Sequence, residues 1–217
     1  MNTLHKKQFL SLAGRPLLFW TIDVFFTHPG IDSIIITLPA PEMSVYSDKI
    51  KLEYPSTKIQ IVPGGNTRQE SVFNALRKCA PETAYVLIHD GVRPFVKSED
   101  ISNLLRLVKL KQAVIPVVKV RDTIKVMTGD KIQKTIDRVG LFNALTPQVF
   151  AYELILDMHR KSVADHLEFT DDAAILEHYG HNVFGWETTG TNFKITYFDD
   201  LVMAEVLIKR KHQGKKI

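Results

Sequence analysis

The sequence alternates short apolar runs with longer amphipathic segments over residues 16–118, and this alternation constrains the fold more than any other feature. The apolar runs suit buried strands at 34–36, 59–62, 85–88 and 113–118. Segments with helical character lie before, between and after them, at 16–29, 42–52, 72–76 and 100–108. Strands that alternate with helices pair in parallel, and the helices cover the faces of the sheet. The pattern therefore predicts an α/β fold with a mostly parallel sheet flanked by helices.

The alternation stops after residue 118. Residues 123–126 and 132–136 are joined through Gly129-Asp130, which predicts an antiparallel hairpin. An isolated two-stranded hairpin is only marginally stable in water, so we expect it to pack against a partner. Further along we predict two helices, two strands and a last helix, at 151–160, 171–179, around Val183, around Ile195 and from about Asp199. We expect a single domain over residues 1–208, followed by a basic tail over 209–217.

The net charge of +4 sits in that tail, because the basic side chains of residues 209–217 supply more than the whole of it. The rest of the chain is close to neutral, which argues against a nucleic-acid-binding face; we expect the tail to be a solvated end. Cys79 is the single cysteine, so an intramolecular disulfide is excluded and a reducing compartment fits. No apolar run approaches the ~20 residues of a membrane span. We predict a soluble cytoplasmic protein with no membrane partner.

In open parallel sheets the ligand binds beyond the carboxyl ends of the strands. Residues 64–71, Gly-Gly-Asn-Thr-Arg-Gln-Glu-Ser, join such a strand to a helix. The two glycines allow close backbone approach, and free N–H groups at a helix start can bind phosphate or the edge of a base. Arg68 could add a positive charge. The alternative interpretation is a turn with an ordinary helix cap.

A second candidate follows the strand at 85–88. Asp90, at the end of that strand, could hold a hard cation that bridges phosphates, and Gly91 permits close approach. Arg93 is either a partner for an anion or a structural brace. The alternative for Asp90 is a capping or turn role. Lys6 and Lys7 come before the first helix and are either site residues or a solvated pair.

Several segments carry recognisable motifs in chain order. They are residues 6–17 (Lys-Lys-Gln-Phe-Leu-Ser-Leu-Ala-Gly-Arg-Pro-Leu), 64–72 (Gly-Gly-Asn-Thr-Arg-Gln-Glu-Ser-Val), 89–95 (His-Asp-Gly-Val-Arg-Pro-Phe), 120–125, 137–148, 170–173 and 192–196. Together they resemble the 2-C-methyl-D-erythritol 4-phosphate cytidylyltransferase family of non-mevalonate isoprenoid synthesis, over residues 6 to about 208. The resemblance implies a Rossmann-like sheet and a transferase reaction. A phosphate oxygen of methylerythritol phosphate attacks the α-phosphorus of CTP, and pyrophosphate leaves.

The resemblance also implies roles for individual residues. Lys7 matches the lysine that stabilises charge on the α-phosphate and leaving group, and Asp90 matches the aspartate that contacts Mg²⁺ and the ribose-phosphate region. The CTP-contacting segment, in which backbone groups read the cytosine edge, is matched by Gly65, Asn66, Arg68 and Ser71, with Gly91 in place of the commoner alanine. The cations that position the sugar phosphate are matched by Arg138 and Lys194. The threonines that bind the phosphate and hydroxyls of the methylerythritol phosphate are matched by Thr123, Thr146 and Thr170. We add Arg93 to this group.

In the family, the region of residues 120–146 forms an arm that reaches across a dimer. The resemblance thus implies a homodimer in which Thr123, Arg138 and Thr146 serve the partner's site. The sequence departs from the family pattern at its start, because Met1 aligns with the methionine that ends an Ala-Ala-Gly-x-Gly-x-Arg-Met loop. We therefore expect the first strand and the glycine-rich phosphate loop to be absent, and such a chain to fold poorly and bind CTP weakly. Phe142 stands where the family usually has tryptophan.

Two alternatives stay open. The sister enzyme that uses ribitol 5-phosphate with CTP shares much of the pattern, although residues 120–123 and 137–145 look more like the methylerythritol enzyme. A truncated, inactive homologue that binds without catalysis is the other.

Overall fold

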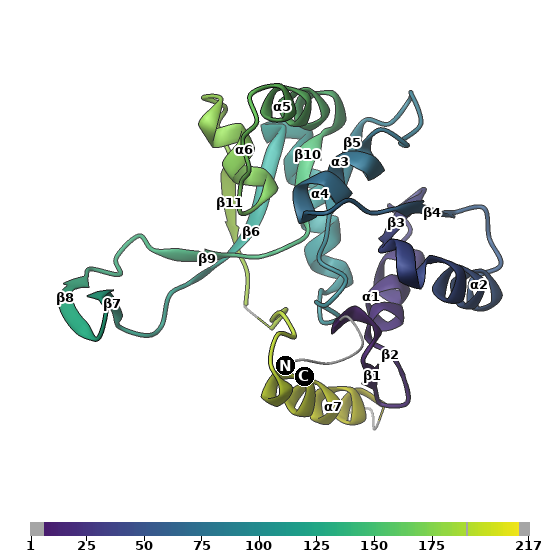
Figure 1. Ribbon diagram of the computed structural model, residues 1–217, viewed down its shortest axis with the longest axis horizontal. Coiled ribbons are helices and arrows are strands. Elements are labelled where there is room, and N and C mark those ends of the chain that lie inside the picture. The colour runs from purple at the N-terminus through teal and green to yellow at the C-terminus, as the bar shows by residue number, and fades with distance from the viewer. Residues whose placement is uncertain (1–6, 190, 213–217) are drawn as a thin grey trace.

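The computed structural model describes residues 7–189 and 191–212 (Figure 1). Its α-helices are α1 (Leu17–Phe26), α2 (Met43–Glu53), α3 (Arg68–Leu76), α4 (Ser98–Lys111), α5 (Tyr152–Ala164), α6 (Asp172–His178) and α7 (Phe198–His212). Its strands are β1 (Ser11–Leu12), β2 (Arg15–Pro16), β3 (Ile34–Leu38), β4 (Ile59–Pro63), β5 (Tyr85–Ile88), β6 (Ala113–Lys119), β7 (Ile124–Thr128), β8 (Lys131–Ile136), β9 (Phe142–Ala144), β10 (Gln148–Ala151) and β11 (Phe184–Glu187). Two 3-10 turns, η1 (Lys7–Phe9) and η2 (Ala40–Glu42), complete the elements. The α/β class and the alternation of strands and helices are confirmed.

The larger sheet has the order β11-β6-β10-β5, with β9 paired to β6. Strands β11 and β6 are parallel, whereas β10 is antiparallel to both β6 and β5. Strand β9 is also antiparallel to β6. The sequence pattern predicted neither β9 nor β10, so this sheet is mixed, whereas a mostly parallel one was expected. Strands β3 and β4 form a separate parallel ladder within the described residues.

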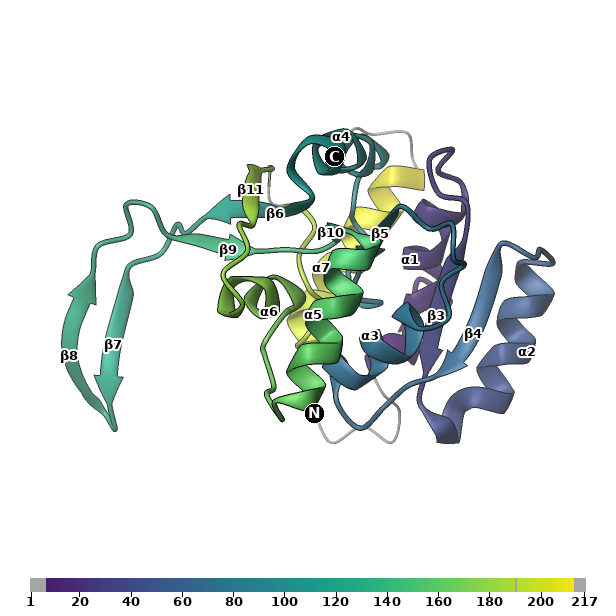
Figure 2. The same cartoon turned by 90° about the horizontal axis from the view of Figure 1, so that it is seen from above.

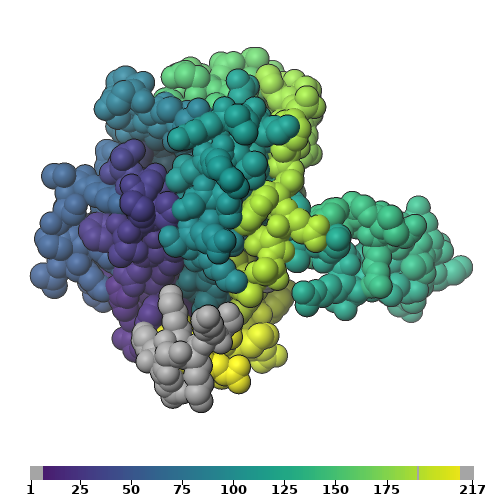
Figure 3. All heavy atoms as spheres, turned by 180° about the vertical axis from the view of Figure 1, so that it is seen from behind, coloured from purple at the N-terminus to yellow at the C-terminus, as the bar shows by residue number. Residues whose placement is uncertain are grey.

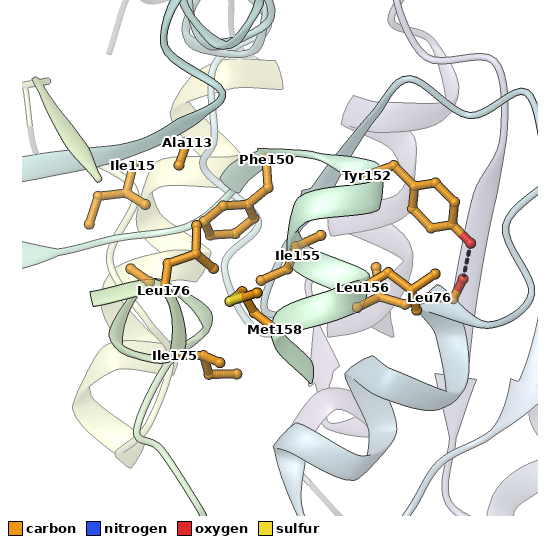
Figure 4. Packing of buried hydrophobic residues seen from close by; sticks show 11 residues of the cluster. Leu76, Ala113, Ile115, Phe150, Tyr152, Ile155, Leu156, Met158, Ile175 and Leu176 are labelled. Atoms are coloured by element: carbon orange, nitrogen blue, oxygen red, sulfur yellow. Dashed lines mark hydrogen bonds between the residues drawn. The ribbon is translucent and has the colours of Figure 1, made fainter. Parts of the chain in front are cut away.

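Helices cover both faces of the larger sheet. Successive side chains of β10 point to opposite faces, so each contacts a different set of helices. Phe150 points into a cluster with α5 and α6 that includes Ile155 and Leu176, drawn in Figure 4. Val149, the preceding residue, packs instead with Val114 and the buried face of α4. The hydroxyl of Tyr152 donates to the carbonyl of Leu76 at 3.0 Å, which ties α5 to the end of α3. This contact lies beside the amino end of β5, because Ala151 pairs with Tyr85.

A second hydrophobic cluster joins the β3–β4 ladder to α1 and α2. Leu18, Ile36 and Ile50 are among its buried side chains. Arg15, which precedes α1, forms ion pairs with Asp23 of α1 and with Glu53 at the end of α2.

The predicted hairpin is confirmed as β7–β8, which projects from the body as an arm (Figures 1 and 2). Figure 3 shows the same arm from behind, standing clear of the other elements. Every residue of β7 is exposed. The arm therefore leaves apolar side chains such as Met127 and Ile132 in solvent.

One expectation near the C-terminus differs from the structure. No strand forms around Ile195 in the described residues; its N–H donates to the carbonyl of Val92, a backbone hydrogen bond outside any ladder. The expected last helix is α7, which runs into the basic segment through Lys209 and Arg210 to His212. The rest of the expected tail, 213–217, lies outside the described residues. None of the described helices is long and apolar enough to cross a membrane.

Candidate active site

A polar pocket of about 220 Å³ opens beyond the carboxyl end of β5. It is lined by Arg68, Asp90, Arg93, Ala144, Leu145, Thr146, Gln148, Thr170, Asp171 and Lys194. The structure thus brings together, from distant parts of the chain, most of the charged and hydroxyl residues that the sequence predicted. A larger groove of about 450 Å³ runs along α7, but apolar side chains dominate its surface. Convergent polar groups mark a binding site, so the pocket beside β5 is the candidate.

Asp90 lies at the centre of this pocket and pairs with three cations. Its Oδ2 is 3.1 Å from Nε of Arg93 and 3.2 Å from Nζ of Lys194, and its Oδ1 is 3.3 Å from Nε of Arg68. Burial by itself raises the pKa of Asp90, but Lys194, Arg68 and Arg93 together hold it well below its usual range. The carboxylate therefore stays ionised and holds the three cations facing one another.

Arg68 is the first residue of α3, and the hydroxyl of Thr67 caps that helix by accepting the N–H of Glu70. Nη1 of Arg68 lies 2.8 Å from Oδ2 of Asp172, a carboxylate of the 170–173 motif that was not among the predicted site residues. Burial lowers the pKa of Arg68, but the charges of Asp172 and Asp90 more than offset it, so the net direction is upward.

His89 connects β5 to the turn before β10. Its Nε2 lies 3.0 Å from the carbonyl of Arg93, and its Nδ1 lies 3.0 Å from Oγ1 of Thr146. Oγ1 of Thr146 also accepts the N–H of Asp90 at 3.2 Å. Burial lowers the pKa of His89 to about 4, so the ring is neutral at pH 7. His89 was not among the predicted site residues. Its position next to Asp90 in the sequence was the feature that could have indicated its role.

Thr146 therefore lies in the pocket of its own chain. Its side chain is buried and hydrogen-bonded to Asp90, whereas the resemblance implied a place in the partner's site. The arm proper ends before it, where β9 returns to pair with β6.

The glycine segment at the end of β4 forms a closed turn. The N–H of Gly65 donates to Oγ of Ser71 at 3.0 Å, and the N–H of Asn66 donates to Oε2 of Glu70 at 2.6 Å. A Cβ added at Gly65 would overlap Cβ of Glu70 and lie 2.7 Å from its Oε2, so this position needs glycine. The two N–H groups already have partners, and they could read a base edge only if Ser71 and Glu70 released them.

Thr170 is held over the pocket by two buried glutamines. Gln69 donates to the carbonyl of Leu167 at 3.0 Å and accepts the N–H of Phe169 at 2.9 Å. Gln148 accepts the N–H of Asp172 at 3.1 Å and donates to Asp171 at 2.7 Å. The cap of α6 is Asp171, which accepts the N–H of Ala174. Thr170 is thus left to line the pocket instead of capping the helix.

Other predicted residues lie away from the pocket. Lys7 is exposed in η1, and Thr123 and Arg138 are exposed at the base of the arm, where Arg138 donates to the carbonyl of Arg121. Gly91 lies beside Asp90 and its carbonyl accepts the hydroxyl of Thr21 at 3.1 Å.

The donor set for a metal is small. Nowhere in residues 7–189 and 191–212 do three or more histidine, cysteine or carboxylate side chains group as metal ligands. Asp90 and Asp171 are the carboxylates of the pocket lining, and Asp171 is engaged by Gln148 and Ala174. A single carboxylate at Asp90 fits Mg²⁺, which proteins commonly bind through one or two carboxylates together with substrate phosphates.

The pocket thus combines an ionised carboxylate, three cations and two threonines. Arg68, Arg93 and Lys194 are suited to bind phosphate oxygens and to offset negative charge that develops during a transfer.

Comparison with known proteins gives a consistent result. The family model for 2-C-methyl-D-erythritol 4-phosphate cytidylyltransferase matches residues 1–210. A protein of that name from Clostridium novyi (strain NT) is 41% identical, with 96% of this chain and 91% of the relative covered. One from Clostridium botulinum (strain Eklund 17B / Type B) is 39% identical, with 97% and 94% covered.

Solved structures agree with the sequence relatives. The 4-diphosphocytidyl-2C-methyl-D-erythritol synthase of Anaerococcus prevotii superposes with a TM-score of 0.85 at 30% identity, covering 94% of this chain and 91% of that one. The 2-C-methyl-D-erythritol 4-phosphate cytidylyltransferase of Thermus thermophilus gives 0.80 at 31% identity, with 94% of both chains covered.

Proposed function

The chain belongs to the 2-C-methyl-D-erythritol 4-phosphate cytidylyltransferase family, and from this premise we propose that it transfers the cytidylyl group of CTP to 2-C-methyl-D-erythritol 4-phosphate. A phosphate oxygen of the sugar alcohol forms a bond to the α-phosphorus, and the bond from that phosphorus to the β-phosphate oxygen breaks. The products are 4-diphosphocytidyl-2-C-methyl-D-erythritol and pyrophosphate.

The arrangement of Arg68, Arg93 and Lys194 around Asp90 is the observation that supports this proposal most. Two anions must approach each other in this reaction, so the protein has to offset their charge and align them. Cations that are already held in place cost little reorganisation when the phosphates arrive. The attacking phosphate oxygen is itself a nucleophile, so the chemistry requires no activated serine or cysteine.

We assign the two substrates to different residues around Asp90. Arg68 and the turn at 64–66 lie at the start of α3 and suit the triphosphate and cytosine of CTP. Lys194, Thr146 and Thr170 also line the pocket, and we assign them to the phosphate and hydroxyls of the sugar alcohol. Lys7, which is exposed in η1, is assigned to the α-phosphate and leaving group by the family resemblance alone.

Asp90 is also the residue we assign to Mg²⁺ or another divalent cation. When bound, this ion would offset charge on the phosphates. Asp90 would have to give up part of its contact with the three cations, and these would then be free to bind phosphate oxygens.

A homodimer with exchanged arms completes the proposal. Thr123 and Arg138 lie on an arm that stands clear of its own body (Figure 3), so a second copy could receive them. Exposed apolar side chains on the arm, among them Met127 and Ile132, favour burial against such a partner. A cytoplasmic location, in keeping with the lone Cys79, belongs to the same proposal.

The test is a pyrophosphate-release assay with CTP, Mg²⁺ and one sugar phosphate at a time. We expect turnover with methylerythritol phosphate to exceed turnover with ribitol 5-phosphate, and Lys194→Ala to abolish most of it. A clear preference for ribitol 5-phosphate would assign the sister activity. CTP binding by calorimetry without turnover on either substrate would indicate a non-catalytic binding protein.

A further inference from the structure

Asp172 is a carboxylate that the transfer reaction does not use directly. Its side chain is 1% exposed at the first turn of α6, so it has no surface with which to touch a substrate. A buried carboxylate is costly unless it is paired. Its partners therefore indicate why the chain keeps it there.

Two side chains from other helices meet Asp172. Its Oδ2 lies 2.8 Å from Nη1 of Arg68 on α3, and its Oδ1 lies 3.1 Å from Nε2 of His159 on α5. An ionised carboxylate only accepts hydrogen bonds, so Nε2 of His159 carries the proton that it donates. The His159 ring is 0% exposed and lies nearly parallel to the ring of Phe73, with centroids 6.0 Å apart. His159 is therefore oriented by Asp172 at Nε2 and by the ring of Phe73, while its buried Nδ1 has no hydrogen-bond partner among the described residues.

We propose that Asp172 and His159 form a buried brace that holds the guanidinium of Arg68 in position for the triphosphate of the nucleotide. Asp172 and His159 are positioning residues in this arrangement, since neither reaches the pocket. The proposal rests on the proposed function, because it takes CTP as the ligand of Arg68.

The two carboxylates around Arg68 differ in what they can do. Asp90 lines the pocket and shares its charge among three cations, so incoming phosphates can draw those cations away. Asp172 lies behind Arg68, is anchored by His159 and is held through its own N–H by Gln148. It can keep its contact when Asp90 loses one. The side chain of Arg68 remains 35% exposed, which leaves guanidinium N–H groups available to the pocket.

The position of Asp172 at the start of α6 also stabilises its carboxylate. Asp172 N–H is directed to Gln148, and its carboxylate lies at the positive end of the helix. The brace therefore links α3, α5, α6 and β10 at one point behind the pocket.

A purely structural salt bridge is the competing explanation, and a double-mutant cycle in CTP binding separates the two. Isothermal titration calorimetry would give the Kd of CTP with Mg²⁺ for Asp172→Asn in the wild-type and the Arg68→Met backgrounds. We expect Asp172→Asn to raise Kd roughly tenfold in the first and less than about twofold in the second. Equal effects in both backgrounds, or no effect in the wild type, would overturn the brace.

Asp157→Asn is the matched control, since Asp157 pairs with Lys161 on the exposed face of α5. It should leave the Kd of CTP unchanged. If Asp172→Asn does not fold, His159→Gln and His159→Leu carry the test. The amide of glutamine reproduces the Nε2 donor, so His159→Gln should bind CTP like the wild type and His159→Leu about threefold more weakly. Equal binding by the two would contradict the proposal.

A measurement without nucleotide distinguishes failure of the brace from failure of the proposed function. The Nη1–H signal of Arg68, the group that faces Asp172, should be protected from solvent exchange in a low-temperature proton–nitrogen correlation spectrum of the wild type. It should lose that protection in Asp172→Asn but not in Asp157→Asn. A signal that stays protected in Asp172→Asn would overturn the brace. A wild type with a protected signal but no affinity for CTP would instead refute the proposed function.

Discussion

Oγ1 of Thr146 lies 3.0 Å from Nδ1 of His89, and it accepts the N–H of Asp90 at the same time. Because Nε2 of His89 faces the carbonyl of Arg93, it carries a proton. Burial keeps the ring neutral by lowering its pKa, so Nδ1 is unprotonated and accepts from Thr146. A neutral imidazole therefore lies directly beside the charged centre of the pocket.

The first prediction concerns acid stability. Burial lowers the pKa of His89 from 6.5 to about 4. Between these values the unfolded chain binds a proton that the folded chain does not, so stability falls as the pH drops through this range. We expect the wild type to lose about 2 kcal/mol of unfolding free energy between pH 7 and pH 5 through this residue. Urea unfolding at both values measures it.

His89→Gln keeps a donor for the carbonyl of Arg93 but cannot titrate, so it should show little of this loss. His181→Gln, at an exposed histidine, should behave like the wild type. Asp90 adds nothing in this range, because its pKa is lowered from 3.8 and its contribution is lost only in stronger acid. An unchanged pH dependence in His89→Gln would contradict the assignment.

The second prediction concerns the loop that carries Thr170. Gln69→Leu preserves size but leaves the N–H of Phe169 and the carbonyl of Leu167 without their partner. We expect it to lower the unfolding free energy by about 2 to 3 kcal/mol and to raise KM for the sugar phosphate. Gln60→Leu, at an exposed position of β4, is the matched control. Equal stability of the two variants would refute the role of Gln69.

The third prediction compares two adjacent glycines. A Cβ at Gly65 would overlap Cβ of Glu70, whereas a Cβ at Gly64 would lie 3.0 Å from Oγ of Ser71. Gly65→Ala must shift the first turn of α3, which carries Arg68. We expect kcat/KM for CTP to fall on the order of tenfold to hundredfold, and by less in Gly64→Ala. Steady-state kinetics decide it, and the reverse order would show that the turn can adjust.

The fourth prediction tests the exchanged arms by mixing inactive variants. Arg138→Ala damages the arm and Lys194→Ala damages the body. In a mixed dimer one pocket would then receive an intact arm and keep an intact Lys194. We expect co-expression to restore roughly a quarter of wild-type turnover, from random pairing of the two chains.

Lys194→Ala mixed with Arg68→Met is the control, because both changes lie in the body and every pocket keeps one of them. That mixture should stay inactive. If the turnover of the Arg138→Ala and Lys194→Ala mixture did not exceed that of either variant alone, the arm would not contribute to the pocket of a second chain.

The sequence was informative where a local pattern carries the structure. The position of Asp90 at the edge of the sheet was predictable because residues that follow a buried strand share that edge. The hairpin followed from two short runs around Gly129-Asp130, and its role as an arm came from the family resemblance alone. Lys194 was found only through its motif, since the strand expected at Ile195 does not form.

Features that depend on tertiary pairing escaped prediction. Strand β10 is four residues long and begins with a buried glutamine, so neither length nor alternation marks it before its neighbours are known. Asp172 looks like an ordinary first-turn acid until α6 packs beside α5 and α3. Thr146 was assigned to the arm by the family resemblance, and nothing in the local sequence marks where β9 rejoins the body.

The position of β10 between β5 and β6 also determines when the sheet can form during synthesis. Strands β5 and β6 both leave the ribosome before β10, which joins them, so neither can complete its ladder until residue 151 has been made. Until then their apolar edges are exposed to other chains and to chaperones. A translational pause after β10 would therefore favour correct assembly, while one between β6 and β10 would prolong the stage at which the nascent chain is most prone to aggregate.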